Sequence, residues 1–193
     1  MPVLKRCPVL GDAERRQIHT LTLVGDSTKD ELGREWGANI WREFDELRIG
    51  RWCRGKECSV RVDRVRGSLG WSDRGIVHNH PEGPVTPSVV DYQTGYKSLD
   101  TYVCISGYER DRPIMRCRVM VKPVYAEEAK KILGDINFRY SNAQDRFYEA
   151  LASSSASFDV VEELEKTLEV VGNEVKKRYE KIYSQECFYR LEK

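Results

Sequence analysis

The sequence predicts an α+β fold, with most strands in the first part of the chain and the longest helices after Pro123. Between residues 36 and 122, short runs of β-branched and aromatic residues alternate with polar ones, as in half-buried strands. Beyond Pro123, apolar residues recur at spacings of three and four, which is typical of amphipathic helices. We therefore expect a domain over residues 1–123 and a C-terminal helical extension over residues 124–193.

The composition limits the class of protein. Of 193 residues, 40% are hydrophobic and 33% charged, which suits one well-cored domain with a charged surface. The net charge of +1 gives no general reason to expect nucleic acid as a partner. No apolar run approaches the roughly 20 residues that span a bilayer, and the N-terminus lacks the apolar core of a signal peptide. We therefore expect a cytoplasmic protein that does not bind a membrane.

The first elements are short. Residues 1–20 predict an irregular or partly helical segment, and the alternation of residues 19–24 predicts a strand. Polar residues 26–28 can cap a short helix that begins near Lys29. Strands then dominate up to about residue 65. Within them the runs 47–52 and 58–63 predict a hairpin, because the intervening Gly-Lys pair suits a type II′ turn.

The middle of the chain predicts a loop over residues 67–74 and a strand over residues 75–77, followed at once by His78. A polar cap and a proline at the first helical position then mark a helix that opens at residues 86–88 and ends near Ser98. The remaining elements are a hairpin over residues 101–106 and 114–121 that turns near residues 110–111, helices over residues 126–133, 137–151 and 158 to about 191, and a turn over residues 153–157.

The last helix carries a long apolar stripe at spacings of three and four. Its members are Val161, Leu164, Leu168, Val171, Val175, Tyr179 and Ile182. The stripe can pack back on the domain, or it can form a homodimer or bind a partner protein. The sequence leaves these alternatives open.

Two pairs of cysteines are placed for contact across neighbouring strands: Cys53 with Cys58, and Cys104 with Cys117. No pair has the CxxC spacing of a zinc ribbon. In a cytoplasmic protein we expect buried free thiols. Disulfides are the alternative if the source is a hyperthermophile, so the bonding of these pairs stays open.

A candidate metal site lies in the stretch HNHPEGPVTPSVVD. His78 and His80 are separated by one residue at the end of a strand, so both side chains point to the same side. Asp91 lies in the first turn of the following helix and can reach the same ion. Three protein ligands leave the fourth tetrahedral position of Zn2+ for water, which is the geometry of a catalytic site. Ser88 lies three residues before Asp91 on the same helix face, where its hydroxyl can donate to an oxyanion.

This pattern resembles the JAMM (MPN+) metalloprotease motif, HxHPxG followed by PSxxD, and most closely its prokaryotic and RadC-like branches. The resemblance is firm over residues 75–92 and looser over about 20–122. It implies a mixed, curved sheet flanked by helices, similar to the cytidine deaminase architecture. It also implies that His78, His80 and Asp91 bind Zn2+, that Ser88 stabilises the oxyanion, and that the reaction hydrolyses peptide or isopeptide bonds. The substrate would be a protein or peptide, such as the tail of a ubiquitin-like protein.

The family also needs an upstream glutamate as general acid and base. Glu35 is the best candidate, because it precedes a small-residue strand and lies 43 residues before His78. Glu31 and Glu43 are the runners-up. The stretch after Glu35 departs from the family in lacking a second glycine and in being highly charged.

Other functions are less well supported by the residues. An HNH nuclease spreads its ligands over a longer unit, and a zinc deaminase needs HxE and PCxxC, whereas position 80 is histidine and no PCxxC occurs. A non-catalytic scaffold or binding module of the same fold remains an alternative, although a complete ligand set argues against it. A DNA-associated role, as the RadC-like resemblance suggests, has the least support.

Overall fold

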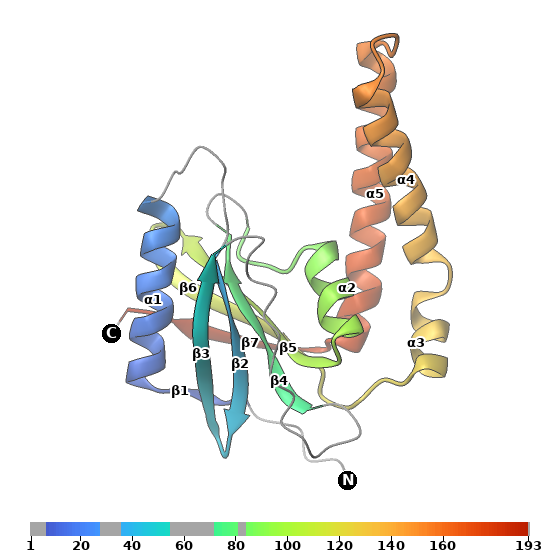
Figure 1. The fold of residues 1–193 in the computed structure, drawn as a ribbon. Coiled ribbons are helices and arrows are strands. Elements are labelled where there is room, and N and C mark those ends of the chain that lie inside the picture. Colours follow the sequence, from blue (N-terminus) through green and yellow to red (C-terminus); the bar gives the residue numbers. More distant parts are fainter. Residues whose placement is uncertain (1–6, 28–35, 55–71, 81–83, 193) are drawn as a thin grey trace. The chain divides into compact units, whose positions relative to one another are not determined.

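The computed structural model describes residues 7–27, 36–54, 72–80 and 84–192. These residues form two compact units (Figure 1). One unit comprises the described residues up to Pro123 together with those from Tyr183 onward, and the other is Val124–Ile182.

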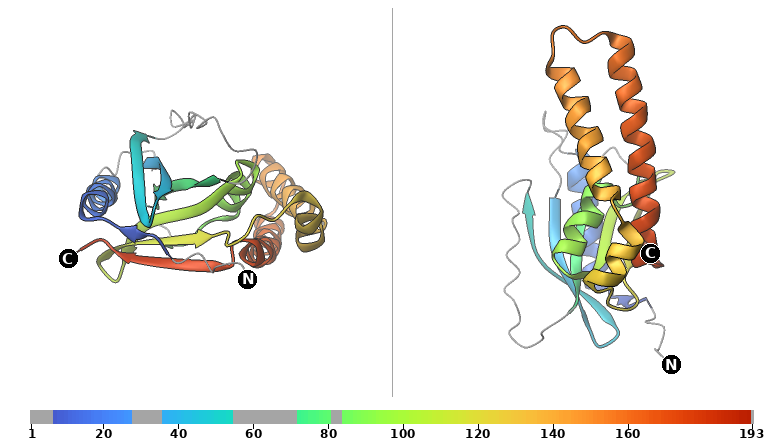
Figure 2. Two further views of the ribbon diagram at one scale, coloured as in Figure 1. Left: turned by 90° about the horizontal axis from the view of Figure 1, so that it is seen from below. Right: turned by 90° about the vertical axis from the view of Figure 1, so that its right-hand side faces the viewer.

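The first unit is built on a mixed sheet of seven strands among the described residues, in the order β1-β3-β2-β4-β5-β6-β7. The strands are β1 (Val9–Leu10), β2 (Trp36–Glu43), β3 (Glu46–Arg54), β4 (Ser72–Asn79), β5 (Asp100–Glu109), β6 (Arg112–Val119) and β7 (Gln185–Arg190). The pairs β1–β3 and β4–β5 are parallel, and the other neighbours are antiparallel. The sheet curves until it is nearly closed, as the left view of Figure 2 shows. The predicted α+β class with a curved mixed sheet is confirmed.

Helix α1 (Asp12–Ser27) includes residues 19–24, so the strand predicted there is wrong. Ile18 and Leu21 lie three residues apart and are buried, which is the spacing of one helix face. The hydroxyl of Thr22 donates to the carbonyl of Ile18 at 2.8 Å and is thereby satisfied inside the helix. Tertiary burial outweighs the β-preference of these branched residues. The helix predicted from Lys29 lies outside the described residues.

Strand β3 pairs with β2 through a two-residue turn, Phe44 and Asp45. The predicted partner of β3, residues 58–63, lies outside the described residues, as does Cys58. Strand β4 begins at Ser72, so residues 72–74, which were predicted to belong to a loop, are part of the strand.

The second predicted hairpin is confirmed, since β5 and β6 pair along their length. Arg110 and Asp111 form its turn with φ values of 50° and 61°. Two successive residues with positive φ are the signature of a type I′ turn, whose twist matches that of the flanking strands.

The second unit consists of three helices within its described residues: α3 (Ala126–Leu133), α4 (Ile136–Ala152) and α5 (Phe158–Ile182). Arg178 on α5 donates to the carbonyl of Leu133 at 2.7 Å, and Asn137 on α4 donates to the Tyr179 hydroxyl at 3.1 Å. These bonds tie the three helices together. No helix in the described part of the chain has both the length and the apolar character that crossing a membrane requires.

The predicted last helix is too long, because α5 ends at Ile182 and the chain continues as β7. In β7 the side chains of Cys187 and Tyr189 are buried while those of Glu186, Phe188 and Arg190 are exposed. This alternation has period two, that of a strand. The final residues therefore belong to the sheet and not to a helical extension that reaches residue 193.

The cysteines form two disulfides among the described residues. Cys104 is bonded to Cys117, its predicted cross-strand partner, and of the two alternatives that the sequence left open for this pair the structure has the disulfide. Cys7 is bonded to Cys187, a pairing over 180 residues that the sequence did not indicate. Cys53 is free. Disulfides persist in oxidising compartments and in the cytoplasm of hyperthermophiles, and a cytoplasmic location stays a prediction.

Asp100 is a buried carboxylate at the start of β5, where it is 4% exposed and lies 3.6 Å from the Arg74 guanidinium. Burial raises the pKa of Asp100 to about 6, against the opposing charge of Arg74. Because the folded state holds this proton more tightly than the unfolded chain, stability from Asp100 is present below pH 4 and is lost as the pH rises through about 6.

Asp100→Asn should therefore stabilise the metal-free protein at pH 7.5 by about 2–3 kcal/mol and leave it unchanged near pH 4. Urea unfolding at the two pH values measures this difference. Asp145→Asn, at an exposed position on α4, is the control and should show no pH-dependent gain. An equal effect of Asp100→Asn at both pH values would contradict the assignment.

Candidate metal centre

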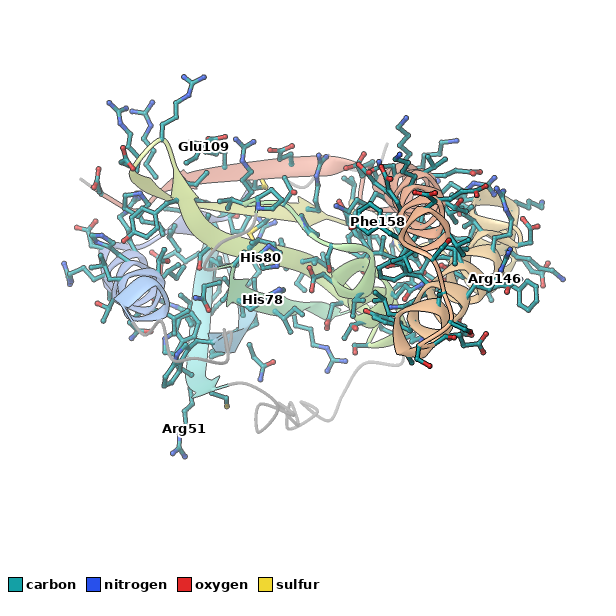
Figure 3. The ribbon with its side chains drawn as sticks, turned by 90° about the horizontal axis from the view of Figure 1, so that it is seen from above. Arg51, His78, His80, Glu109, Arg146 and Phe158 are labelled. Carbon is teal, nitrogen blue, oxygen red and sulfur yellow. A yellow bond between two sulfur atoms is a disulfide. The ribbon has the colours of Figure 1, made fainter. Side chains whose placement is uncertain are left out.

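The end of β4 places the two predicted histidine ligands beside α2 (Val89–Lys97), the helix that carries Asp91. His78 lies in β4 between Gly37 of β2 and Ile105 of β5. His80 follows the strand, and its backbone N–H donates to the carbonyl of Ser106 at 2.9 Å. Figure 3 labels both histidines, which come from this one strand end.

The three ligand atoms converge. The Nε2 atoms of His78 and His80 are 3.1 Å apart, and they lie 3.1 and 3.6 Å from the two carboxylate oxygens of Asp91. A tetrahedral ion with bonds of about 2.0–2.1 Å separates its ligand atoms by about 3.3 Å. The observed spacings are close to that value, so the three residues fit Zn2+. Among the described residues, one cluster of at least three histidine, cysteine or acidic side chains brings its ligand atoms close enough together to hold a metal ion, and this is that cluster.

His80 is oriented by a contact on its other nitrogen. Its Nδ1 lies 3.0 Å from the carbonyl oxygen of Pro84. A carbonyl can only accept, so Nδ1 carries the proton and Nε2 keeps its lone pair toward His78 and Asp91. Outer contacts of this kind fix the tautomer and the direction of histidine ligands. Because the partner is a backbone atom, no side-chain pattern in the sequence identifies it.

Asp91 is held by the start of its own helix. The Ser88 backbone N–H donates to Asp91 Oδ2 at 2.6 Å, and the Asp91 N–H donates to the Ser88 hydroxyl at 3.2 Å. This is a capping box, with Ser88 as the N-cap and Asp91 as the third helical residue. The helix therefore begins two residues later than predicted, at Val89, with Pro87 outside it.

The electrostatics of Asp91 suit a metal ligand. Burial alone would raise the pKa of this carboxyl, but contacts with His78 and His80 and the Ser88 N–H outweigh burial and hold the pKa well below its usual range.

Ser88 is placed beside the ligands with its hydroxyl accepting a hydrogen bond from Asp91. A hydroxyl that accepts keeps its own proton for donation. The predicted oxyanion donor is thus also the helix cap, and the two roles use different parts of the same group.

Asn79, between the two histidines, was not singled out in the sequence. It is 1% exposed, and its Oδ1 accepts the backbone N–H of Trp36 at 2.6 Å. This bond fastens the first residue of β2 to the end of β4. In addition, a Cβ on Gly37 would lie 3.3 Å from the Cβ of His78, so glycine allows the two strands to pack closely there.

The predicted general base, Glu35, lies outside the described residues, as does Glu31. In the sequence Glu35 directly precedes Trp36, the residue bonded to Asn79. Glu43 is at the far end of β2, about 20 Å along the strand from the residue that pairs with His78. There Glu43 accepts from Arg48 at 2.9 Å. This position removes Glu43 as a candidate.

A groove of about 570 Å³ opens between α1 and the β2–β3 hairpin. Its lining is Ala13, Arg16, Gln17, Thr20, Leu21, Trp36 and Trp52. Because side chains alternate along a strand, Trp36 faces away from the side of β2 on which Gly37 meets His78. The groove is therefore not part of the ligand cluster.

Comparisons of the chain with protein-family models, with curated proteins and with solved structures found no match.

Proposed function

We propose that this chain is a zinc-dependent hydrolase of peptide or isopeptide bonds. The observation that carries the proposal is the convergence of His78, His80 and Asp91 at 3.1–3.6 Å, from one strand end and one helix start. A set of two histidines and one carboxylate leaves a position open for water, as in catalytic zinc sites. These residues belong to the JAMM-like motif, so we further propose that the chain is a JAMM-type metalloprotease with the cytidine-deaminase-like architecture of that family.

The proposed hydrolysis needs three chemical groups: the zinc ion, the Glu35 carboxylate and the Ser88 hydroxyl. When bound, zinc would act as a Lewis acid and lower the pKa of water to about 7. Glu35 would take the proton from the attacking water and pass it to the leaving amine. The Ser88 hydroxyl would donate to the carbonyl oxygen as it gains charge. Pro84 and the Ser88 backbone keep His80 and Asp91 in position through their hydrogen bonds.

Metal analysis of the purified protein, combined with cleavage of a panel of ubiquitin-like fusions, tests the function. Glu35→Gln should keep one zinc per chain and lose activity by about 100-fold or more, the usual contribution of a general base. Glu43→Gln should keep both, because Glu43 is remote from the ligands. Full activity in Glu35→Gln would refute the assignment of the base.

A non-catalytic scaffold is the competing function. It predicts no cleavage of any fusion by the zinc-loaded wild type, together with binding of a partner protein. Salt titration of DNA binding tests the DNA-associated alternative, which requires binding that survives physiological salt.

A further inference from the structure

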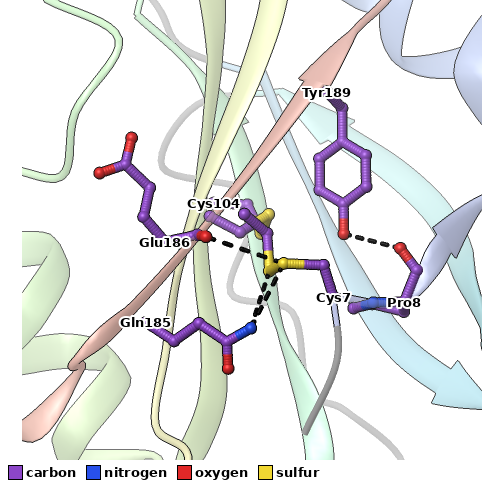
Figure 4. The surroundings of a disulfide bond; sticks show 8 residues. Cys7, Pro8, Cys104, Gln185, Glu186 and Tyr189 are labelled. Atoms are coloured by element: carbon purple, nitrogen blue, oxygen red, sulfur yellow. Dashed lines mark hydrogen bonds between the residues drawn. A yellow bond between two sulfur atoms is a disulfide. The ribbon is translucent and has the colours of Figure 1, made fainter.

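Four cysteines meet where the curved sheet closes on itself (Figure 4). Cys104 on β5 is opposite Cys117 on β6, which in turn is opposite Cys187 on β7. All three are at most 1% exposed and lie in the same core cluster, so they form one row on the inner face of the sheet. Cys7 extends this row to the N-terminal segment through its bond to Cys187.

The two disulfides differ in accessibility. Cys7 is exposed, whereas both sulfurs of the Cys104–Cys117 bond are buried. Reduction of a disulfide requires a thiolate to reach one of its sulfur atoms. A reductant in solution can therefore attack Cys7 in the folded protein, but it has no direct path to Cys104 or Cys117.

Cys187 lies close enough to form a disulfide with either Cys7 or Cys117. Its Cα lies 5.6 Å from that of Cys7, its present partner. Directly opposed residues on antiparallel strands, such as Cys117 and Cys187, have Cα atoms about 4.5–5.5 Å apart, which is also within the range that a disulfide spans. The Gln185 amide lies 3.4 Å from the Cys7 sulfur and 3.9 Å from the Cys187 sulfur and donates to both. Such a donor favours a thiolate on either residue.

We propose that Cys187 relays thiol–disulfide exchange from the exposed Cys7 to the buried Cys104–Cys117 bond. A dithiol reductant attacks Cys7 and releases Cys187 as a thiolate, and its second thiol then frees Cys7 and leaves as a cyclic disulfide. Cys187 attacks Cys117, which forms a Cys117–Cys187 bond and releases Cys104. Cys7 then attacks Cys187, which restores the Cys7–Cys187 bond and releases Cys117. One dithiol is oxidised and one buried disulfide is reduced, so the electrons balance.

The relay connects the outside of the protein to β5, the neighbour of the strand β4 at whose end the candidate metal ligands lie. Cys104 pairs with Val77, the residue before His78. Reduction at Cys7 would therefore remove a cross-link from the strand next to the candidate metal centre. This inference does not depend on the proposed activity.

Dithiothreitol treatment of the folded chain tests the relay, with timed quenching by N-ethylmaleimide and peptide mass spectrometry of each cysteine. Cys53→Ser with Cys58→Ser is the background, so that only the four cysteines above remain. In this background, with one equivalent of dithiothreitol, thiols at Cys7 and Cys187 should appear first and then decline as thiols at Cys104 and Cys117 accumulate, because the relay restores the Cys7–Cys187 bond. Adding Cys187→Ser should slow reduction of the Cys104–Cys117 bond at least tenfold. Adding Cys7→Ser instead leaves Cys187 as a free thiol, which should form a Cys117–Cys187 bond and leave Cys104 open to alkylation.

If the Cys7–Cys187 bond only holds the sheet closed, its removal should not slow reduction of the Cys104–Cys117 bond. Its loss in Cys187→Ser would then loosen the sheet and leave the rate of Cys104–Cys117 reduction unchanged or higher, and either result would overturn the relay. Absence of a Cys117–Cys187 bond in folded Cys7→Ser would overturn it as well. Urea unfolding of each variant confirms that the reaction is followed in folded protein. The two single variants act at an exposed and a buried site, so one remains informative if the other does not fold.

Discussion

Asp91→Asn should abolish stoichiometric zinc binding and leave the fold intact. The amide keeps an oxygen that can accept the Ser88 N–H, now 2.6 Å from Asp91 Oδ2, so the start of α2 is preserved. It removes the negative charge that balances the cation between His78 and His80. Loss of a direct ligand should cost more than the 10–100-fold in affinity that outer contacts contribute.

The measurements are metal content per chain and thermal unfolding with and without added zinc. Wild type should hold one zinc and gain thermal stability from it, because a ligand that binds only the folded state stabilises that state. Asp91→Asn should show neither effect.

Ser88→Ala is the matched control for Asp91→Asn. It removes the hydroxyl that caps α2 and should cost about 1 kcal/mol of stability. It leaves all three ligands in place, so zinc content should remain one per chain. If Asp91→Asn bound zinc as tightly as Ser88→Ala, the carboxylate would not be a ligand.

Gly75→Ala should destabilise the first unit by about 4 kcal/mol or more. A Cβ at this position would lie 1.9 Å from the carbonyl oxygen of Tyr102, and a backbone atom on a neighbouring strand cannot turn aside. The strands β4 and β5 shift register between Ser72 and Gly75, which brings the two backbones close together. Overpacking against backbone is among the few mechanisms that give such large losses.

Urea unfolding measures the loss at position 75, and Gly50→Ala on β3 is the control. A Cβ at Gly50 would have its nearest neighbour at 3.5 Å, an ordinary contact, so alanine should be neutral or slightly stabilising there. Zinc affinity should also fall in Gly75→Ala, since β4 carries His78 three residues later. A change of less than 1 kcal/mol in Gly75→Ala would show that β4 and β5 are not paired in this register.

Elements with strong local signals were predicted from the sequence. The turn at residues 110–111 and α3 are each determined by residues close together in the chain. The helix that carries Asp91 was predicted too, but two residues too early and without Ser88 as its cap. Elements that are stabilised by contacts between residues far apart in the chain were not predicted from the sequence. Residues 19–24 favour a strand locally, yet burial of Ile18 and Leu21 in the core makes them helical. The alternation in β7 was concealed by the helical periodicity that precedes it.

The same division applies to the candidate site. His78, His80, Ser88 and Asp91 could be identified because one strand end and one helix start lie within fourteen residues, where spacing determines direction. The sequence could not show that Pro84 orients His80 through a backbone atom, or that Asn79 fastens Trp36 across 43 residues. These contacts depend on where the chain returns in space.

The sequence by itself therefore predicted the candidate ligands, their order and a helix that carries Asp91, but not Ser88 as the cap that holds Asp91. The tertiary structure alone decided the 3.1–3.6 Å convergence of the ligand atoms and the closure of the sheet by Cys7 and Cys187. The reason is physical: hydrogen-bonding and capping preferences act over a few residues, whereas the curvature of the sheet brings together groups that are up to 180 residues apart.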